Sequence, residues 1–82
     1  MAASHTPPLA ILRRKQVEQR TGLSRSTIYD KLSSKSPRFD PSFPKAIQLG
    51  ANSVGWLESE IDEWIDGRVY FTREVINLVR IT

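Results

Sequence analysis

The sequence contains no cysteine and only one histidine, His5, among its 82 residues. The absence of cysteine excludes disulfide bonds, thiolate zinc sites and thiol nucleophiles, so stability has to come from packing alone. It also fits a reducing cytosol, and we expect a cytoplasmic protein. A lone histidine is more often a solvated side chain than a metal ligand, so we expect neither a metal nor another cofactor.

Long hydrophobic runs and glycine-rich motifs are also missing. Uninterrupted apolar runs are only a few residues long, far short of the roughly 20 residues that cross a bilayer. The four glycines are dispersed along the chain, so no phosphate-binding glycine loop is formed. No serine or threonine has a base at a recognisable spacing. We therefore expect a protein that is not an enzyme and does not enter a membrane.

The composition is that of a small folded domain. Hydrophobic residues make up 39% and charged residues 26% of the 9.3 kDa chain, which is ordinary for soluble proteins. A domain of this size buries only about 60% of the surface of its unfolded chain, so its largest apolar side chains are needed for the core. Trp56 and Trp64 are the first candidates.

Charge is distributed unevenly along the sequence. Residues 13–45 contain nine Lys or Arg against three acids, a net charge of +6, whereas residues 46–66 contain five acids and no base. Residues 67–82 return to a net charge of +2. The first segment would attract polyanions, although a solvated basic surface is the alternative explanation.

Two short helices are predicted in the basic segment. Residues 14–22 favour a helix that stops at Gly22, and Ser24 is placed to cap a second helix over residues 24–34. The apolar positions expected to share a core are Val17, Leu23, Ile28 and Leu32. This spacing is typical of a helix-turn-helix, and an ordinary αα-hairpin is the alternative.

A hairpin and a third helix are expected next. Residues 36–45 contain three prolines, which neither a helix nor a paired strand accommodates, so they form a loop. Apolar alternation in residues 46–50 and 53–56 flanks a Gly/Asn turn and predicts a two-stranded hairpin, as in a wing. Leu57, Ile61, Trp64 and Ile65 then recur at helical spacing among acids that form a solvated face. We expect this helix to end at Gly67.

The fold class is therefore mainly α with a small β-hairpin wing, a single-domain winged helix-turn-helix. We divide the chain into a flexible arm over residues 1–10, a winged helix-turn-helix domain over residues 11–67 and an extension over residues 68–82. A weak helix is expected over residues 73–80. Its apolar content means that it either folds back on the core, which we favour, or meets a partner chain.

The second helix has the features expected of a DNA-binding module. Its exposed N-terminal end would enter the major groove, where Arg25 can donate in a fork to a guanine. Basic residues that follow would attract the phosphate backbone, and Asp30 is expected to pair with Arg25 or Lys31 within the helix. The candidate DNA-binding residues are Ser24, Arg25, Ser26, Thr27, Tyr29, Lys31, Lys35, Arg38 and Lys45.

Three ordered motifs carry a family resemblance: TGLSRSTIYDKL at 21–32, FPKAIQLG at 43–50 and SVGWLESEIDEWI at 53–65. The sequence resembles the AlpA family of prophage regulators, small winged helix-turn-helix proteins. The resemblance implies a phage or prophage transcriptional regulator, with Ser24 to Tyr29 in the recognition helix and Phe43 and Pro44 leading into the wing. Many relatives carry a basic wing tip, whereas residues 50–53 here are neutral.

Several hypotheses about the function remain open at this point. The chain is expected to bind double-stranded DNA as a sequence-specific transcriptional regulator, and small size suggests a homo-oligomer on DNA. A contact with integrase or RNA polymerase is a further hypothesis for such a regulator. One alternative is an excisionase-like recombination directionality factor that bends an attachment site. Another is a protein-interaction module that uses the apolar C-terminal tail and does not bind DNA.

Overall fold

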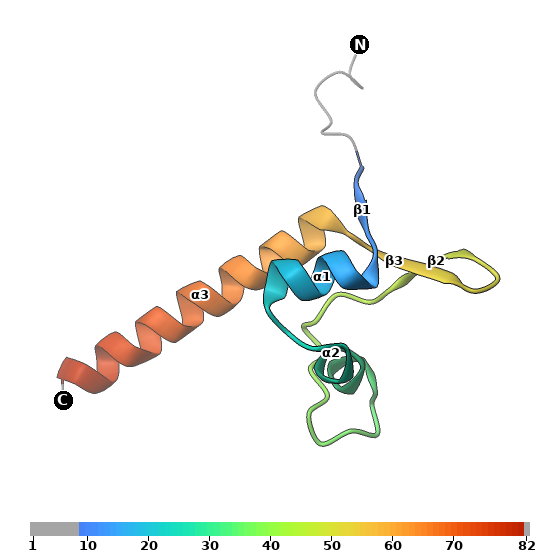
Figure 1. The fold of residues 1–82 in the computed structure, drawn as a ribbon. Coiled ribbons are helices and arrows are strands. Elements are labelled where there is room, and N and C mark those ends of the chain that lie inside the picture. Colours follow the sequence, from blue (N-terminus) through green and yellow to red (C-terminus); the bar gives the residue numbers. More distant parts are fainter. Residues whose placement is uncertain (1–8, 82) are drawn as a thin grey trace, which may run out of the picture.

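The computed structural model describes residues 9–81, and the side chains of residues 9–74 (Figure 1). Two short helices are followed by a hairpin and one long helix, which confirms the winged helix-turn-helix fold. The elements, in chain order, are β1 (Ile11–Leu12), α1 (Arg14–Thr21), α2 (Arg25–Leu32), β2 (Ile47–Gly50), β3 (Ser53–Leu57) and α3 (Glu58–Ile81).

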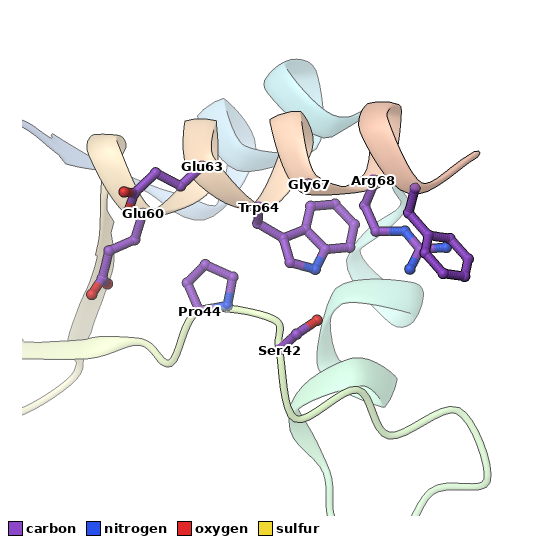
Figure 2. A pocket seen from close by; sticks show the side chains of 8 residues that line it. Ser42, Pro44, Glu60, Glu63, Trp64, Gly67 and Arg68 are labelled. Carbon is purple, nitrogen blue, oxygen red and sulfur yellow. The ribbon is translucent and has the colours of Figure 1, made fainter. Parts of the chain in front are cut away.

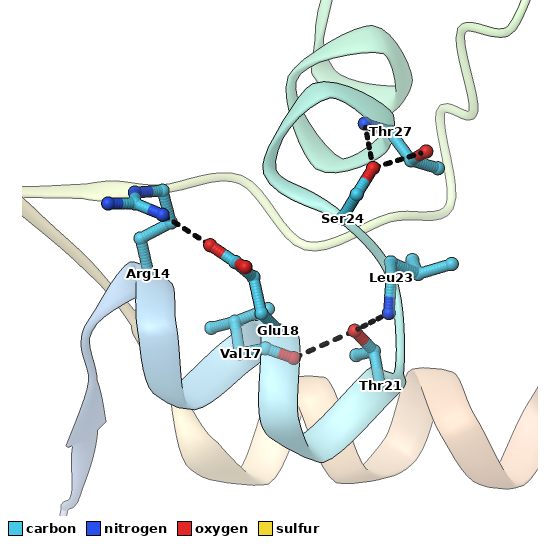
Figure 3. Close-up of polar contacts among 7 residues, drawn as sticks. All are labelled: Arg14, Val17, Glu18, Thr21, Leu23, Ser24 and Thr27. Carbon is cyan, nitrogen blue, oxygen red and sulfur yellow. Dashed lines mark hydrogen bonds and ion pairs between the residues drawn. The ribbon is translucent and has the colours of Figure 1, made fainter.

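The turn between α1 and α2 forms as predicted. Gly22 adopts a left-handed conformation with φ 76° and donates its N–H to the carbonyl of Glu18 at 2.8 Å, and only glycine takes this conformation without strain. The Ser24 hydroxyl then accepts a hydrogen bond from the backbone N–H of Thr27 at 3.2 Å (Figure 3). The predicted second helix is shorter than expected, because α2 ends at Leu32.

The sheet contains one strand that the sequence analysis did not predict. β3 is the central strand and pairs with both β1 and β2 in antiparallel orientation, so the order is β1-β3-β2. β1 has only two residues, and Ile11 and Leu12 lie opposite Leu57 and Trp56. Gly55 permits this pairing, because a Cβ there would meet Ile11 and lie 3.1 Å from the Leu12 carbonyl oxygen. β1 thereby anchors the hairpin to the chain that enters α1.

The core collects side chains from every element except β2, and from the loops that precede α2 and β2. Its buried members are Leu12, Val17, Ile28, Phe43, Trp56 and Ile61, and Leu23, Leu32, Val54, Trp64 and Ile65 pack around them. Trp56 is fully buried, and its indole N–H donates to the carbonyl of Pro44 at 3.1 Å. Phe43 meets Trp64 edge to face at 4.9 Å between ring centroids. The other predicted core positions are thus confirmed, but Leu57, which was expected on the buried face of the third helix, is the last residue of β3 and lies outside this cluster.

The expected end of the third helix at Gly67 is wrong, because α3 continues without interruption to Ile81. Gly67 lacks the positive φ of a helix-terminating glycine. A glycine inside a helix costs about 1 kcal/mol relative to alanine, which weakens a helix but does not end one. The expected helix over residues 73–80 is therefore part of α3. Residues 67–74 are exposed, so this part of the extension does not fold back on the core as we expected.

Candidate nucleic-acid interface

The N-terminal half of α2 exposes the side chains that the sequence singled out. Arg25 and Ser26 are exposed, Tyr29 is 41% exposed, and Ile28 faces the core. The Arg25 guanidinium lies over the Tyr29 ring, 5.8 Å from its centroid, which orients the guanidinium without neutralising its charge. α2 thus offers a charged and aromatic surface of the kind that reads base edges.

Ser24 and Thr27 have a structural role at the same helix end. Besides accepting from the Thr27 N–H, the Ser24 hydroxyl shares a hydrogen bond of 3.0 Å with the Thr27 hydroxyl. Both hydroxyls are therefore engaged in the cap. They hold the start of α2 in place, and a contact with a nucleic acid would have to share these hydrogen bonds.

A hollow between α1, α2 and the hairpin adds residues that the sequence analysis did not include. It is lined by Arg13, Arg14, Lys15, Tyr29, Asn52 and Val54. Arg13 donates from its Nε to the carbonyl of Val54 at 3.0 Å and so ties the hairpin to the start of α1. The signal for this basic cluster was present as three consecutive cations at residues 13–15. Their position beside Tyr29 depends on β1, which was not predicted.

Two of the predicted DNA-binding cations are engaged in pairs near the C-terminal end of α2. Arg38 pairs with Asp30 at 3.3 Å, so the expected pair of Asp30 within its own helix is wrong. Lys31 instead lies 3.9 Å from Asp40 and 5.5 Å from the centroid of the Trp64 ring. Lys31 lies beside Asp40 because the loop after α2 folds back on the helix, where the Asp40 N–H donates to the Lys31 carbonyl.

Lys35 and Lys45 are exposed and make no ion pair with any residue in the range 9–74. Lys35 follows the C-terminal end of α2, and Lys45 borders a hollow with Lys31 and Phe39. The structure therefore separates the predicted residues into two groups. Tyr29 borders the basic cluster of α1 and Arg25 lies over the Tyr29 ring, while the lysines lie toward the other end of α2.

The acidic helix is connected to α1 through one arginine. Arg20 donates to Glu58 at 2.7 Å and to Asp62 at 2.8 Å, and these hydrogen bonds, that of Glu58 first, raise the pKa of Arg20. Two of the five acids predicted to form a solvated face are thus paired. The distal part of α3 leaves the domain on the side away from the β2–β3 hairpin (Figure 1).

Asp40 makes the loop after α2 sensitive to acid. Partial burial by itself raises the pKa of Asp40, but the hydrogen bonds from the Ser42 hydroxyl and N–H, with the charge of Lys31, lower it below its ordinary value. The two Ser42 contacts are 2.6 and 2.9 Å long. Because the native pKa is the lower one, ionised Asp40 stabilises the fold above the unfolded pKa, and this contribution is lost as pH falls through the native pKa.

Asp40→Asn is expected to lower the free energy of unfolding at pH 7 by roughly 0.5–1.5 kcal/mol. The difference between the variant and the parent protein should shrink as pH falls below the ordinary aspartate pKa of about 3.9 and through the lower native pKa of Asp40. Urea unfolding from pH 3 to pH 7 measures both effects, with the exposed Asp66→Asn as the control. A constant difference over this range would contradict a role for the Asp40 charge.

Comparison with known proteins places this arrangement in a family. The family model of the prophage CP4-57 regulatory protein (AlpA) matches residues 10–69. The chain belongs to the AlpA family. One AlpA relative, the "DNA-binding transcriptional activator AlpA" of Escherichia coli K12, is 59% identical over 58 residues, which are 71% of this chain and 83% of that protein.

A second relative comes from a virus. An uncharacterised protein of Enterobacteria phage P4 is 40% identical over 58 residues, which are 71% of this chain and 59% of the phage protein. No solved structure matches the chain significantly. None of the helices in residues 9–81 is both long enough and apolar enough to span a membrane. The family match covers β1, α1, α2, the hairpin and the first half of α3, and the second half of α3, residues 70–81, lies beyond it.

Proposed function

We propose that this protein is a sequence-specific DNA-binding transcriptional regulator of the prophage type, with α2 placed in the major groove. The observation that carries the proposal is the exposed N-terminal half of α2, beside the cations at residues 13–15 and the hairpin. The name of the Escherichia coli relative, a DNA-binding transcriptional activator, supports the same function. Such a regulator works on DNA in the cytoplasm.

In the proposed complex, the exposed side chains of α2 contact the DNA, and the residues at its cap hold the helix in position. Arg25 donates its guanidinium fork to O6 and N7 of a guanine, Ser26 contacts a neighbouring base or phosphate, and the Tyr29 hydroxyl reaches a phosphate. Ser24 and Thr27 hold the helix end in position. The hairpin carries the neutral Ala51 and Asn52 at its tip. It can therefore fit against the DNA and offer the Asn52 amide for a hydrogen bond, but it adds no positive charge.

The remaining cations supply attraction that does not depend on sequence. Arg13 and Lys15 border the same hollow as Tyr29 and are placed to contact the backbone next to the groove. Lys35 and Lys45 add long-range attraction from the far end of α2. Lys31 and Arg38 contribute less, because Asp40 and Asp30 already offset their charges.

The decisive experiment is a fluorescence-anisotropy titration on pooled genomic fragments at several salt concentrations, followed by sequencing of the retained DNA. The logarithm of the binding constant should fall with the logarithm of salt concentration, by about 0.9 per phosphate neutralised. One sequence should be enriched over random DNA of equal length. If no fragment binds at low salt, the proposal is wrong, and the protein-interaction module becomes the better explanation.

The position of the enriched sequence then separates two regulatory roles. A footprint over a promoter, with a changed transcript level from a reporter, supports the transcriptional role. A footprint inside an attachment site without any effect on the reporter would contradict it and favour a recombination directionality factor. A promoter site would imply a contact with RNA polymerase, and an attachment site would imply a contact with integrase.

A further inference from the structure

The outer side of α2 carries a carboxylate, Asp30, that the DNA contacts proposed above do not use. Ile28 is fully buried and Leu32 packs against the core. At about 100° per residue, Asp30 lies about 160° around the helix axis from both of them. Ser26 precedes Asp30 by four residues, so it lies beside Asp30 on the same side. With α2 in the major groove, this side faces the base edges.

Charge directs DNA toward this outer side of α2. One flank of α2 faces α3, since Lys31 lies 5.5 Å from the centroid of the Trp64 ring. Trp64 borders a hollow along α3 (Figure 2). That hollow also holds two carboxylates, Glu60 and Glu63, against one cation, Arg68, and this negative charge repels phosphates. The outer side of α2, and its flank beside the basic cluster of α1, are thus the surfaces that DNA can approach.

Arg38 is held beside Asp30 by the loop after α2. Its Nη1 donates to Oδ2 of Asp30 at 3.3 Å. The loop backbone is fixed on either side of Arg38, because the Ser36 N–H donates to the Ser33 carbonyl and the Phe39 N–H donates to the Ser36 carbonyl, both at 3.0 Å. The Arg38 N–H itself donates to the Ser36 hydroxyl at 3.1 Å. The side chains of Asp30 and Arg38 are 39% and 72% exposed, so the pair is accessible from outside.

The pair keeps further acceptors and donors for a ligand. The contact between the two side chains uses one oxygen of the carboxylate and one nitrogen of the guanidinium, whereas a carboxylate has two acceptor oxygens and a guanidinium has five N–H donors. The remaining groups can therefore bind a base pair while the contact stays in place. Because Arg38 offsets the charge of Asp30, the carboxylate can approach DNA without the full repulsion from the phosphates.

One kind of base pair fits this combination of groups. In the major groove, a C·G pair shows the N4 amino donor of cytosine next to the O6 and N7 acceptors of guanine. Asp30 can accept from the cytosine amino group while Arg38 donates to the guanine. An A·T pair instead places its amino donor between its two acceptors and adds the thymine methyl group, so a guanidinium fork does not reach both acceptors there.

We propose that Asp30 and Arg38 together recognise one C·G base pair in the major groove, with Asp30 accepting from cytosine N4 and Arg38 donating to the guanine. The inference rests on the proposed function, because it requires α2 in the major groove. It adds the loop after α2 to the parts of the chain that determine specificity. Asp30 follows Arg25 by five residues, about 7.5 Å along the helix axis, so this base pair is distinct from the guanine assigned to Arg25.

Anisotropy titrations of the full-length chain test this pair on the enriched DNA sequence and on duplexes in which each base pair is replaced in turn. For the parent, replacing the recognised C·G pair by A·T should weaken binding about 5- to 100-fold. Asp30→Ala should reduce this difference to within about twofold and keep the preferences at other positions. Asp30→Asn should shift the preference at this position to A·T, because an amide pairs with adenine. The matched control, Asp66→Ala, removes an exposed carboxylate of α3 and should leave every preference unchanged.

Arg38→Ala separates base recognition from general attraction. It should flatten the preference at the same position as Asp30→Ala, and the double variant should lose no more discrimination there than either single variant, because both side chains act on one base pair. Equal losses on all duplexes for Arg38→Ala would overturn the inference, as would an Asp30→Ala variant with the parent's preference at every position. Either result would leave the proposed function standing, whereas a parent without any sequence preference would overturn both. Circular dichroism would show that the variants remain folded.

Discussion

Trp56→Ala is expected to lower the free energy of unfolding by about 3–5 kcal/mol, the usual loss when a buried aromatic ring is deleted from a core. Trp56 is fully buried in the central strand β3 and is the largest of the six core side chains. The substitution also leaves the Pro44 carbonyl without its indole donor. Because the single core of a domain near this size rarely supplies more than about 3–5 kcal/mol, the variant should be close to unfolded at 37 °C.

Urea unfolding at low protein concentration, followed by circular dichroism, measures this loss. Trp56→Phe should fall between the parent and Trp56→Ala, since it keeps a ring in the core but removes the hydrogen bond to Pro44. Tyr70→Ala is the matched control, because Tyr70 is an exposed aromatic residue on α3, and its loss should change stability by less than about 0.5 kcal/mol. A loss for Trp56→Ala no larger than that of Tyr70→Ala would show that the core is centred elsewhere.

The elements that the sequence predicts well are those with signals inside the element itself. Gly22 ends α1 and Ser24 caps α2 through contacts with residues at most four positions away, so their patterns can be read locally. The hairpin is defined in the same way by its own turn. β1 gives no such signal, because its two residues become a strand only by pairing with Leu57 and Trp56, some 45 positions later in the chain.

The same distinction applies to the candidate site. The capping pattern places Arg25, Ser26 and Tyr29 at an exposed helix end, and the structure has them there. The partners of Lys31 and Asp30 were not predictable, because they come from a loop whose path depends on Phe43 entering the core. Arg13 was missed for a similar reason, since its contact with Val54 spans 41 residues. Helix spacing shows which residues are exposed, and tertiary contacts determine which cations remain unpaired.

Arg25→Ala is expected to remove about 1–3 kcal/mol of binding free energy to the preferred DNA sequence while leaving binding to random DNA nearly unchanged. Arg25 is exposed at the N-terminal end of α2 and held over Tyr29. It carries no ion pair with the rest of residues 9–74. Its guanidinium therefore needs no local partner to be displaced before it contacts a guanine, and its loss should relax base preference at one position of the site.

Lys35→Ala provides the matched comparison, because it also removes one exposed cation but lies beyond the opposite end of α2. It should weaken specific and random DNA alike and reduce the slope of the salt dependence by about 1. Anisotropy titrations of both variants on the two DNAs, at matched salt, separate a base contact from general attraction. Equal losses on specific and random DNA for Arg25→Ala would mean that Arg25 contacts phosphates, and base reading would then have to come from other residues of the interface.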